Sequence, residues 1–488
     1  MATVHKPKKK ASTDGGKPGA PAGRYLRSFT LSSVRTFHSP VTLDFCREDG
    51  SIAQWTVILG ENGTGKTTLL QYLAGMVPTD KMRTSVRDEP LEVYGPLLLN
   101  PLWHAWHFGN AVRREAVPNQ IQAKLRVSKS VSCFVDAEAE EVDHSIQLQV
   151  GWNLRAEPPS AAPLGYWGGH ASEIKKHLRL FGYGASRHVA GASSPYLTSD
   201  ATEGASHETA ATLYNDDLPL ISPEQWFLGL DHFSRSDEPG ARPASKALAS
   251  AQRCFVSVLP DIDGLVVKSY AGFRKQPAMT LMCRTPYGEV PFSSLSVGYR
   301  TMAAWLTDFV KRMHEAFPDL DEPDDGPAVV LIDEFDLHMH PKWQREAMAA
   351  LSKEFPNTQF IVTAHSPLIV QAAEGQAKLI VLRRLQHKDG TEEVVVDDHP
   401  RYAAGWRVDQ ILNSDLYGMD PRSATYEKLM NERVALRQKE RLSAAEQKRL
   451  AEVEEQLDRE APPGIADASK QLFADLQKAL REVQAKKP

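Results

Sequence analysis

The segment Gly60–Thr67 restricts the fold of this chain more than any other part of its sequence. It reads Gly60-Glu61-Asn62-Gly63-Thr64-Gly65-Lys66-Thr67, which matches in full the pattern of a glycine-rich loop that holds phosphate groups. An apolar run, Trp55–Leu59, precedes the loop, and a helical pattern with Leu69 and Leu70 follows it. A buried strand, a tight glycine turn and a helix N-terminus aim backbone amides at a phosphate. The segment therefore predicts an α/β nucleotide-binding fold.

The residue types in this loop indicate ATP and Mg²⁺ as cofactors. Lys66 is placed to reach the β and γ phosphates, and the hydroxyl of Thr67 is placed to bind Mg²⁺. The glycines let the backbone turn its amides toward the phosphates. The candidate ATP-binding residues in the loop and at the start of the helix are Gly60, Glu61, Asn62, Gly63, Thr64, Gly65, Lys66, Thr67 and Thr68.

A second apolar run ends in two carboxylates. Ala328–Ile332 has the pattern of a buried strand, and Asp333 and Glu334 follow it directly. Beside a phosphate-binding loop, we expect Asp333 to hold Mg²⁺, usually through a water molecule. Glu334 is then placed to polarise the attacking water, as general base or orienting group. The pair predicts that the bound nucleotide is hydrolysed.

Two further segments complete an ordered set of motifs. Leu295–Arg300 opens a helical pattern and resembles the LSGG-type signature of ABC ATPases, with Val297 in place of the first glycine. His365 follows a third buried strand and resembles the switch histidine of that family. The order of the four motifs along the chain is the ABC order. This resemblance implies that Ser296 and Gly298 contact the γ-phosphate bound to the opposite subunit, and that His365 reads it as a catalytic residue.

The stretch Asp336–Gln344 follows the two carboxylates and contains His338 and His340. In the resemblance to ABC ATPases it corresponds to the D-loop, which crosses the interface between two subunits. A metal site made by the two histidines and a nearby aspartate is the less favoured alternative.

Alternating strand and helix patterns predict a mostly parallel sheet covered by helices. We expect a P-loop ABC-type ATPase core of the α/β class, built from residues 24–76 and 291–400. Residues 77–290 read as a long mixed α/β insertion with mobile loops. Residues 1–23 read as a disordered basic tail, and residues 401–488 as a C-terminal helical module.

The C-terminal module has a turn signal in its middle. The segment Ser443-Ala444-Ala445-Glu446 reads as a capping box, in which the serine and the glutamate satisfy free amides at a helix start. This predicts two helices with a turn near Ser443 instead of one long coiled coil. A last amphipathic helix is expected over Leu472–Val483.

Composition excludes several classes of protein. The 488 residues carry a formal net charge of −5, so the whole molecule is not a basic coat for nucleic acid. The four cysteines form no Cys-x-x-Cys pair, which fits a reducing cytoplasm better than a disulfide framework. No apolar run approaches the roughly 20 residues that cross a bilayer. We therefore expect a cytoplasmic protein with no membrane partner.

Two longer segments extend the resemblance to a narrower group. Leu331–Gln344 and Phe360–Pro367 closely resemble a bacterial group of RecF-like and OLD-like ATPases, and Leu180–Arg187 and Leu213–Leu220 also look like segments of this group. The resemblance covers most of residues 25–400. Members act on DNA ends, in recombination repair or in anti-phage defence. The defence members include the PtuA-type ATPases of Septu and retron systems.

The resemblance implies partners for the chain. PtuA-type ATPases assemble with a separate HNH nuclease, whereas OLD-type proteins carry a fused Toprim nuclease. A Toprim domain needs a Glu and an Asp-x-Asp pair at strand ends, and the sequence after His365 contains no such arrangement. We therefore expect an ATPase without its own nuclease domain, which forms a homo-oligomer from head-to-tail dimers and regulates a partner effector nuclease. DNA or RNA is a further candidate partner.

Two alternatives follow from the same motifs. A DNA-repair ATPase of the RecF or SMC type would need a longer antiparallel coiled coil or a basic DNA-binding face. A subunit of an ABC transporter would be more compact, with the phosphate loop and the signature closer together. The long segment between these two motifs argues against the transporter, and the irregular pattern of that segment argues against a coiled-coil arm.

Overall fold

The computed structural model divides into two compact units, Met1–Ile411 and Leu412–Pro488, which are considered separately. It describes residues 25–31, 36–37, 39–75, 82–86, 89–93, 130–139, 142–153, 160–163, 178–189, 208–237, 240–271, 277–373, 375, 377–387, 390, 392–398, 405–414, 416–417, 424–437, 439 and 443–460. The expected basic tail and the expected helix over Leu472–Val483 lie outside these residues.

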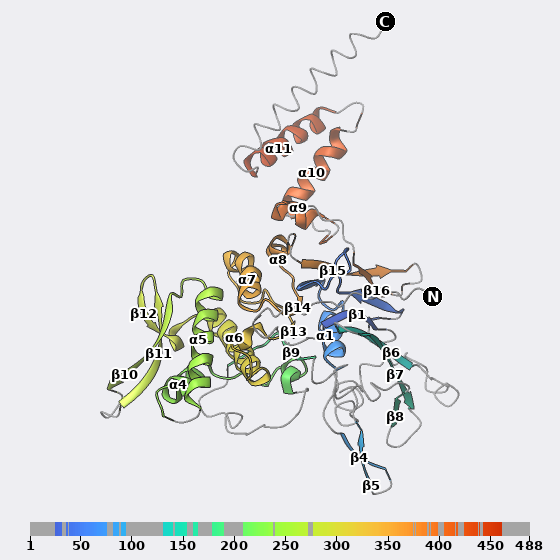
Figure 1. Cartoon of the computed structure of the whole chain (residues 1–488). Coiled ribbons are helices and arrows are strands. Elements are labelled where there is room, and N and C mark those ends of the chain that lie inside the picture. Colours follow the sequence, from blue (N-terminus) through green and yellow to red (C-terminus); the bar gives the residue numbers. More distant parts are fainter. Residues whose placement is uncertain are drawn as a thin grey trace, which may run out of the picture. The chain divides into compact units, whose positions relative to one another are not determined.

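A six-stranded sheet forms the centre of the first unit, in the order β16-β15-β3-β14-β13-β9 (Figure 1). The strands are β16 (Glu392–Asp397), β15 (Ala377–Gln386), β3 (Trp55–Gly60), β14 (Thr358–Thr363), β13 (Ala328–Ile332) and β9 (Leu180–Tyr183). All neighbours are parallel except the edge pair β15 and β16. The sheet confirms the predicted α/β class, and its inner strands β3, β14 and β13 are almost fully buried because both faces are covered.

The two faces of the sheet carry different cores, since successive side chains of a strand point in opposite directions. Leu331 and Ile361 belong to the core shared with α1 (Lys66–Gly75) and with β1 and β2. On the opposite face, Phe360 stacks on Trp55 with ring centroids 4.2 Å apart. This face is covered by α6 (Val297–Ala316) and α7 (Pro341–Glu354), whose Phe309 and Phe355 rings join it.

A second sheet of antiparallel strands lies over α1, in the order β2-β1-β6-β7-β8. Its strands are β1 (Tyr25–Leu31), β2 (Val41–Asp44), β6 (Ser130–Ala139), β7 (Val142–Asn153) and β8 (Ser160–Pro163). A separate pair, β4 (Met82–Val86) and β5 (Glu89–Val93), forms a hairpin.

The segment 77–290 contributes to the core as well as extending from it. Its strand β9 is the edge of the central sheet, next to β13. Downstream come a 3-10 helix η5 (Glu208–Leu213), α4 (Pro223–Ser234), α5 (Ala241–Val258) and a third sheet of β10 (Gly264–Ala271), β11 (Pro277–Thr285) and β12 (Gly288–Pro291). The expected insertion therefore supplies one strand that the central sheet needs.

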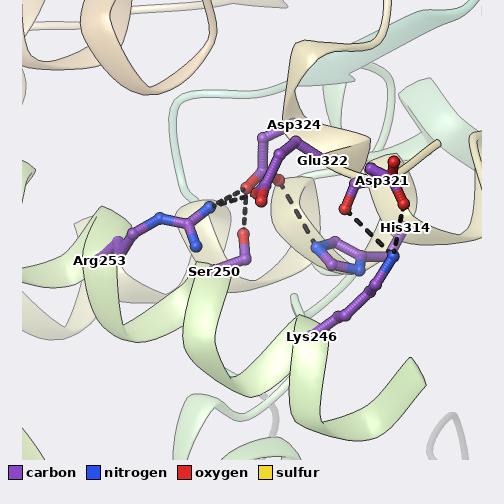
Figure 2. Close-up of polar contacts among 7 residues, drawn as sticks. All are labelled: Lys246, Ser250, Arg253, His314, Asp321, Glu322 and Asp324. Carbon is purple, nitrogen blue, oxygen red and sulfur yellow. Dashed lines mark hydrogen bonds and ion pairs between the residues drawn. The ribbon is translucent and has the colours of Figure 1, made fainter. Parts of the chain in front are cut away.

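A polar cluster joins α5 and α6 to the segment that leads into β13 (Figure 2). Asp324, in the short helix η8 (Pro323–Asp325), accepts a hydrogen bond from the Ser250 hydroxyl. Arg253 Nη2 lies 3.5 Å from Asp324 Oδ2 and 3.0 Å from Glu322 Oε2. His314 Nε2 lies 3.7 Å from the other oxygen of Asp324. Three elements thus meet at one buried carboxylate.

The second unit contains a helical hairpin. Its helices are α10 (Ala424–Arg437) and α11 (Ala444–Glu460), and they pack through Leu429, Val453 and Leu457. Ser443 N–H donates to Glu446 Oε2 at 2.9 Å, and Glu446 N–H donates to Ser443 Oγ at 3.4 Å. The predicted turn and capping box are therefore confirmed. The short helices α8 (Pro367–Ala372) and α9 (Val408–Asn413) precede this hairpin in the chain.

None of the helices that the structure describes has the length and apolar character required to span a membrane.

Candidate functional site

The loop between β3 and α1 has the backbone conformation that its glycines predict. Gly63 and Gly65 have φ values of +78° and +95°, in the left-handed region that glycine adopts readily. A Cβ at Gly65 would lie 2.7 Å from the Phe37 ring, so the position has no room for a side chain. Lys66 Nζ donates to the carbonyl oxygens of Gly60 at 2.9 Å and Glu61 at 3.0 Å. The side chain of Lys66 thus folds back over the first residues of the loop.

A row of hydrogen bonds connects this loop to the ends of β13 and β14. Thr67 Oγ1 donates to Asp333 Oδ2 at 2.6 Å, and Thr363 Oγ1 donates to Asp333 Oδ1 at 2.6 Å. Glu334 N–H donates to the same Thr363 oxygen at 2.7 Å. The structure therefore brings Thr67, Asp333 and Glu334 together, as the sequence predicted. Thr363 was not predicted, and its only signal was a polar side chain at the last position of a buried strand.

Glu334 lies in a turn with a left-handed backbone, at φ +48°. Its carbonyl oxygen accepts a hydrogen bond from Arg187 Nη2 at 2.7 Å and one from Leu337 N–H at 3.0 Å. Arg187 is only 2% exposed. Arg187 ends a segment that resembles the RecF-like and OLD-like group, but its burial beside Glu334 was not predicted, because the charge of a lone arginine usually lies in solvent.

His365 follows the end of β14 and lines the same cavity as the loop. Its N–H donates to the carboxylate of Asp336, at 3.1 Å and 3.3 Å from the two oxygens. Partial burial lowers the pKa of His365, and the positive charge of Lys66 lowers it further, against the opposing effect of Asp336 and its neighbours. The ring is therefore neutral at pH 7, and it can accept or donate a hydrogen bond.

These elements surround one cavity of about 270 Å³. Its lining residues are Thr36, Asn62, Gly63, Gly65, Lys66, Thr67, Thr68, Asp333, Glu334 and His365. Burial lowers the pKa of Lys66, while the negative charges of Asp333, Glu334 and Asp336 oppose the shift. A hydroxyl and a carboxylate held 2.6 Å apart are oxygen ligands of the kind that Mg²⁺ prefers. The cavity thus has the hydrogen-bond donors and the charged groups that suit a nucleoside triphosphate with Mg²⁺.

The structure does not bring the signature residues to this cavity within one chain. Ser296 is exposed at the start of α6, and its side chain makes no capping hydrogen bond in the part of the chain that the structure describes. Gly298 lies against the D-loop, where an added Cβ would be 2.4 Å from the carbonyl oxygen of His338. A role for Ser296 and Gly298 therefore requires a second subunit, as the resemblance to ABC ATPases implies.

The metal alternative for the D-loop histidines gains no support. Among the residues described, no group of three or more His, Cys, Asp or Glu side chains is arranged to hold a metal ion. His340 instead caps α7, where its Nδ1 accepts a hydrogen bond from Lys342 N–H at 3.4 Å.

Comparison with known proteins supports an ATPase related to defence systems. Residues 199–371 match a family model described as an AAA domain, putative AbiEii toxin, type IV TA system. The Septu protein PtuA of Bacillus mycoides (strain KBAB4) is 22% identical over 399 residues, which cover 81% of this chain. The Retron Vc95 probable ATPase of Vibrio cholerae serotype O1 biovar El Tor is 33% identical over 136 residues, 28% of this chain. The predicted resemblance to PtuA-type and retron ATPases is confirmed.

The chain spans less than half the length of these two relatives, since the matched segments cover 45% of the PtuA chain and 25% of the retron chain. Among solved structures, an SmcHead bound to the C-winged helix domain of ScpA aligns over 77% of this chain and 98% of its own, with a TM-score of 0.42 and 12% identity. The assignment of a P-loop ABC-type α/β fold rests on the sheet order and the loop geometry described above.

Proposed function

We propose that this chain binds and hydrolyses ATP, and that its nucleotide state regulates a separate effector nuclease in anti-phage defence. The observation that carries the enzymatic half is the row of hydrogen bonds from Thr67 through Asp333 and Thr363 to Glu334, beside Lys66. A hydroxyl, two carboxylates and a cation gathered at one cavity are the groups that phosphoryl transfer to water uses, which supports the proposal. The regulatory half is supported by the similarity to Septu and retron proteins.

Each residue of the row has a distinct task in this proposal. Lys66 and the loop amides bind the phosphates, and Thr67 and Asp333 would hold Mg²⁺. Mg²⁺, when bound, supplies positive charge that neutralises the phosphate oxygens. Glu334 orients the attacking water and accepts its proton, and Thr363 fixes the turn from which Glu334 projects. His365, which also lines the cavity, is a candidate to form a hydrogen bond with the γ-phosphate.

The second half of each site comes from another copy of the chain in this proposal. Ser296 is exposed at the N-terminus of α6, where its hydroxyl and the free amides of the helix can meet an anion. Two chains arranged head to tail would place this helix start over the partner's phosphate loop. Two ATP molecules would then lie between the subunits, so the dimer would form or tighten when ATP is bound.

The enzymatic proposal is tested with two substitutions and matched controls. Lys66→Ala should weaken ATP binding about 10- to 100-fold, the value of a lost charge-assisted hydrogen bond. Glu334→Gln should bind ATP normally and slow phosphate release by about 10² to 10⁴, the usual contribution of a general base. Glu346→Gln and Lys353→Ala, two exposed positions on α7 outside the D-loop, should leave both measurements unchanged. Hydrolysis at the wild-type rate by Glu334→Gln would refute the assignment.

The regulatory proposal is tested by co-expressing the chain with the products of adjacent reading frames. An HNH nuclease that co-purifies, and whose cleavage of DNA differs between the wild type and Glu334→Gln in the presence of ATP, is the expected result. DNA-stimulated ATP hydrolysis by the chain alone, with no nuclease in the complex, would instead favour the repair ATPase of the RecF or SMC type.

A further inference from the structure

Arg187 lies beside the proposed catalytic turn although it is far from it in the sequence. It follows β9, the edge strand that pairs with β13 in parallel. Asp333 N–H donates to the carbonyl oxygen of Tyr183 at 2.8 Å, which extends the pairing to the last residue before Glu334. Because the carboxyl ends of two parallel neighbours lie at the same edge of a sheet, the segment after β9 runs next to the segment after β13. The topology thus delivers Arg187 to the turn.

The guanidinium of Arg187 is buried near acidic groups, and among the described residues it forms no ion pair with a carboxylate. Its Nη2 donates to the backbone carbonyl of Glu334 at 2.7 Å, and its Nε has no hydrogen-bond partner among the residues described. The negative charges of Asp333, Asp336 and Glu334 all act on it. Burial lowers the pKa of Arg187 to about 10, so the side chain is still a cation at neutral pH. In a structural ion pair, two nitrogens of the guanidinium commonly bond to one carboxylate. Here the Nη2 of Arg187 bonds to a backbone carbonyl oxygen instead.

Both backbones at this contact are held in an uncommon conformation. Arg187 has a φ of +35° and Glu334 a φ of +48°, and neither is a glycine. Such conformations are strained for residues with a side chain, and they persist where the surrounding structure holds them. On the Arg187 side, Leu220 N–H donates to the carbonyl of His188 at 2.8 Å and fixes the chain directly after the arginine. The backbone at Arg187 is therefore held in place, so its side chain can stabilise the turn at Glu334.

We propose that Arg187 is a positioning residue for Glu334: its Nη2 fixes the left-handed turn, and so directs the Glu334 carboxylate at the water that attacks ATP. This inference rests on the proposed role of Glu334 in hydrolysis. It assigns a role in the chemical step and none in nucleotide binding, because Arg187 does not line the cavity and its contact is with the backbone carbonyl of Glu334.

The test compares three variants of the full chain. Arg187→Met removes the charge and the donor, and should lower kcat about 100-fold, the effect of a misplaced catalytic group, with KM and ATP affinity within about twofold of wild type. Arg187→Lys keeps the charge but lacks a donor with the reach and direction of Nη2, and should lower kcat about tenfold. Arg179→Met is the control, because Arg179 is also partly buried and lies at the opposite end of β9. Its kcat should equal that of wild type.

Two readouts separate positioning from a general structural role. Hydrogen exchange should speed up in the peptide that contains Glu334–Met339 in both Arg187 variants and stay unchanged in Arg179→Met. In a Glu334→Gln background, adding Arg187→Met should not slow the residual single-turnover hydrolysis further, because Arg187 acts through Glu334. If Arg187→Met does not fold, the Arg187→Lys variant carries both comparisons.

Several results would overturn the proposal. They are a wild-type kcat in Arg187→Met, a loss of ATP affinity as large as the loss of kcat, and an additive effect in the Glu334→Gln background. Equal losses of kcat in Arg187→Met and Arg179→Met would also overturn it. A failure of the proposed function looks different, since in that case Glu334→Gln itself hydrolyses ATP at the normal rate.

Discussion

Substitution of Asp324 by asparagine should change how the stability of the first unit depends on pH. Asp324 is buried in the polar cluster of α5, α6 and η8, and burial raises its pKa from the ordinary 3.8 to about 6, although Ser250 and Arg253 oppose the shift. The difference corresponds to about 3 kcal/mol of stability, at 1.36 kcal/mol for each tenfold change in proton affinity.

The sign of the effect follows from which state holds the proton more tightly. The folded state keeps the proton on Asp324 up to about pH 6, and the unfolded state loses it near pH 3.8. The stabilisation is therefore complete below pH 3.8 and is lost as the pH rises through 6. About 1.4 kcal/mol of it is lost between about pH 5 and pH 8. Asp324→Asn cannot lose it, so the variant should gain about 1.4 kcal/mol relative to wild type over that range.

Urea unfolding followed by tryptophan fluorescence is a suitable assay, because all nine tryptophans lie within Met1–Ile411 and report on the first unit alone. Burial lowers the pKa of the neighbouring His314 to about 4. That histidine is present in both proteins, so its contribution to the pH dependence largely cancels when the variant and the wild type are subtracted. A difference between the two proteins that is the same at both pH values would refute the reasoning. A relative gain by the wild type at higher pH would do so as well.

Two other substitutions test close contacts described above. Gly298→Ala should reduce ATP turnover about tenfold or more, because the added methyl would lie 2.4 Å from the His338 carbonyl and displace the helix or the D-loop. Gly229→Ala, at a helix position with open space, should leave phosphate release unchanged and is the control. Ser443→Ala should remove the cap of α11 and destabilise the hairpin by about 1 kcal/mol. Hydrogen exchange of α11 amides should then be about fivefold faster, and an unchanged rate would contradict the role of the cap.

Much of the central sheet could be predicted because its strands are continuous apolar runs with clear ends. The predicted strand Ala328–Ile332 matches β13, and the helical pattern that opens at Leu295–Arg300 corresponds to the start of α6. Strand β9 could not be assigned to this sheet, although its residues had been singled out by resemblance. Four residues are too short for a reliable pattern, and pairing with β13 is a contact between segments far apart in the sequence.

The candidate site was predictable to the extent that its residues lie in local motifs. Lys66, Thr67, Asp333 and Glu334 follow strand ends, and strand ends of a parallel sheet meet at one edge. Arg187 and Thr363 escaped prediction because their roles depend on what they face. An arginine becomes a buried cation only where the fold gathers carboxylates around it. Those carboxylates come from distant parts of the sequence, so the residues next to Arg187 do not predict them.

The tight contact between Gly298 and His338 has a consequence for how two sites in a dimer would behave. It leaves no gap between the start of α6, which would face a partner's nucleotide in the proposed dimer, and the turn that follows the carboxylates of the chain's own site. Any shift of α6 on meeting ATP across the interface must then press on the D-loop of its own subunit. The two nucleotide sites would therefore be coupled, because filling one site would alter the affinity or the rate at the other.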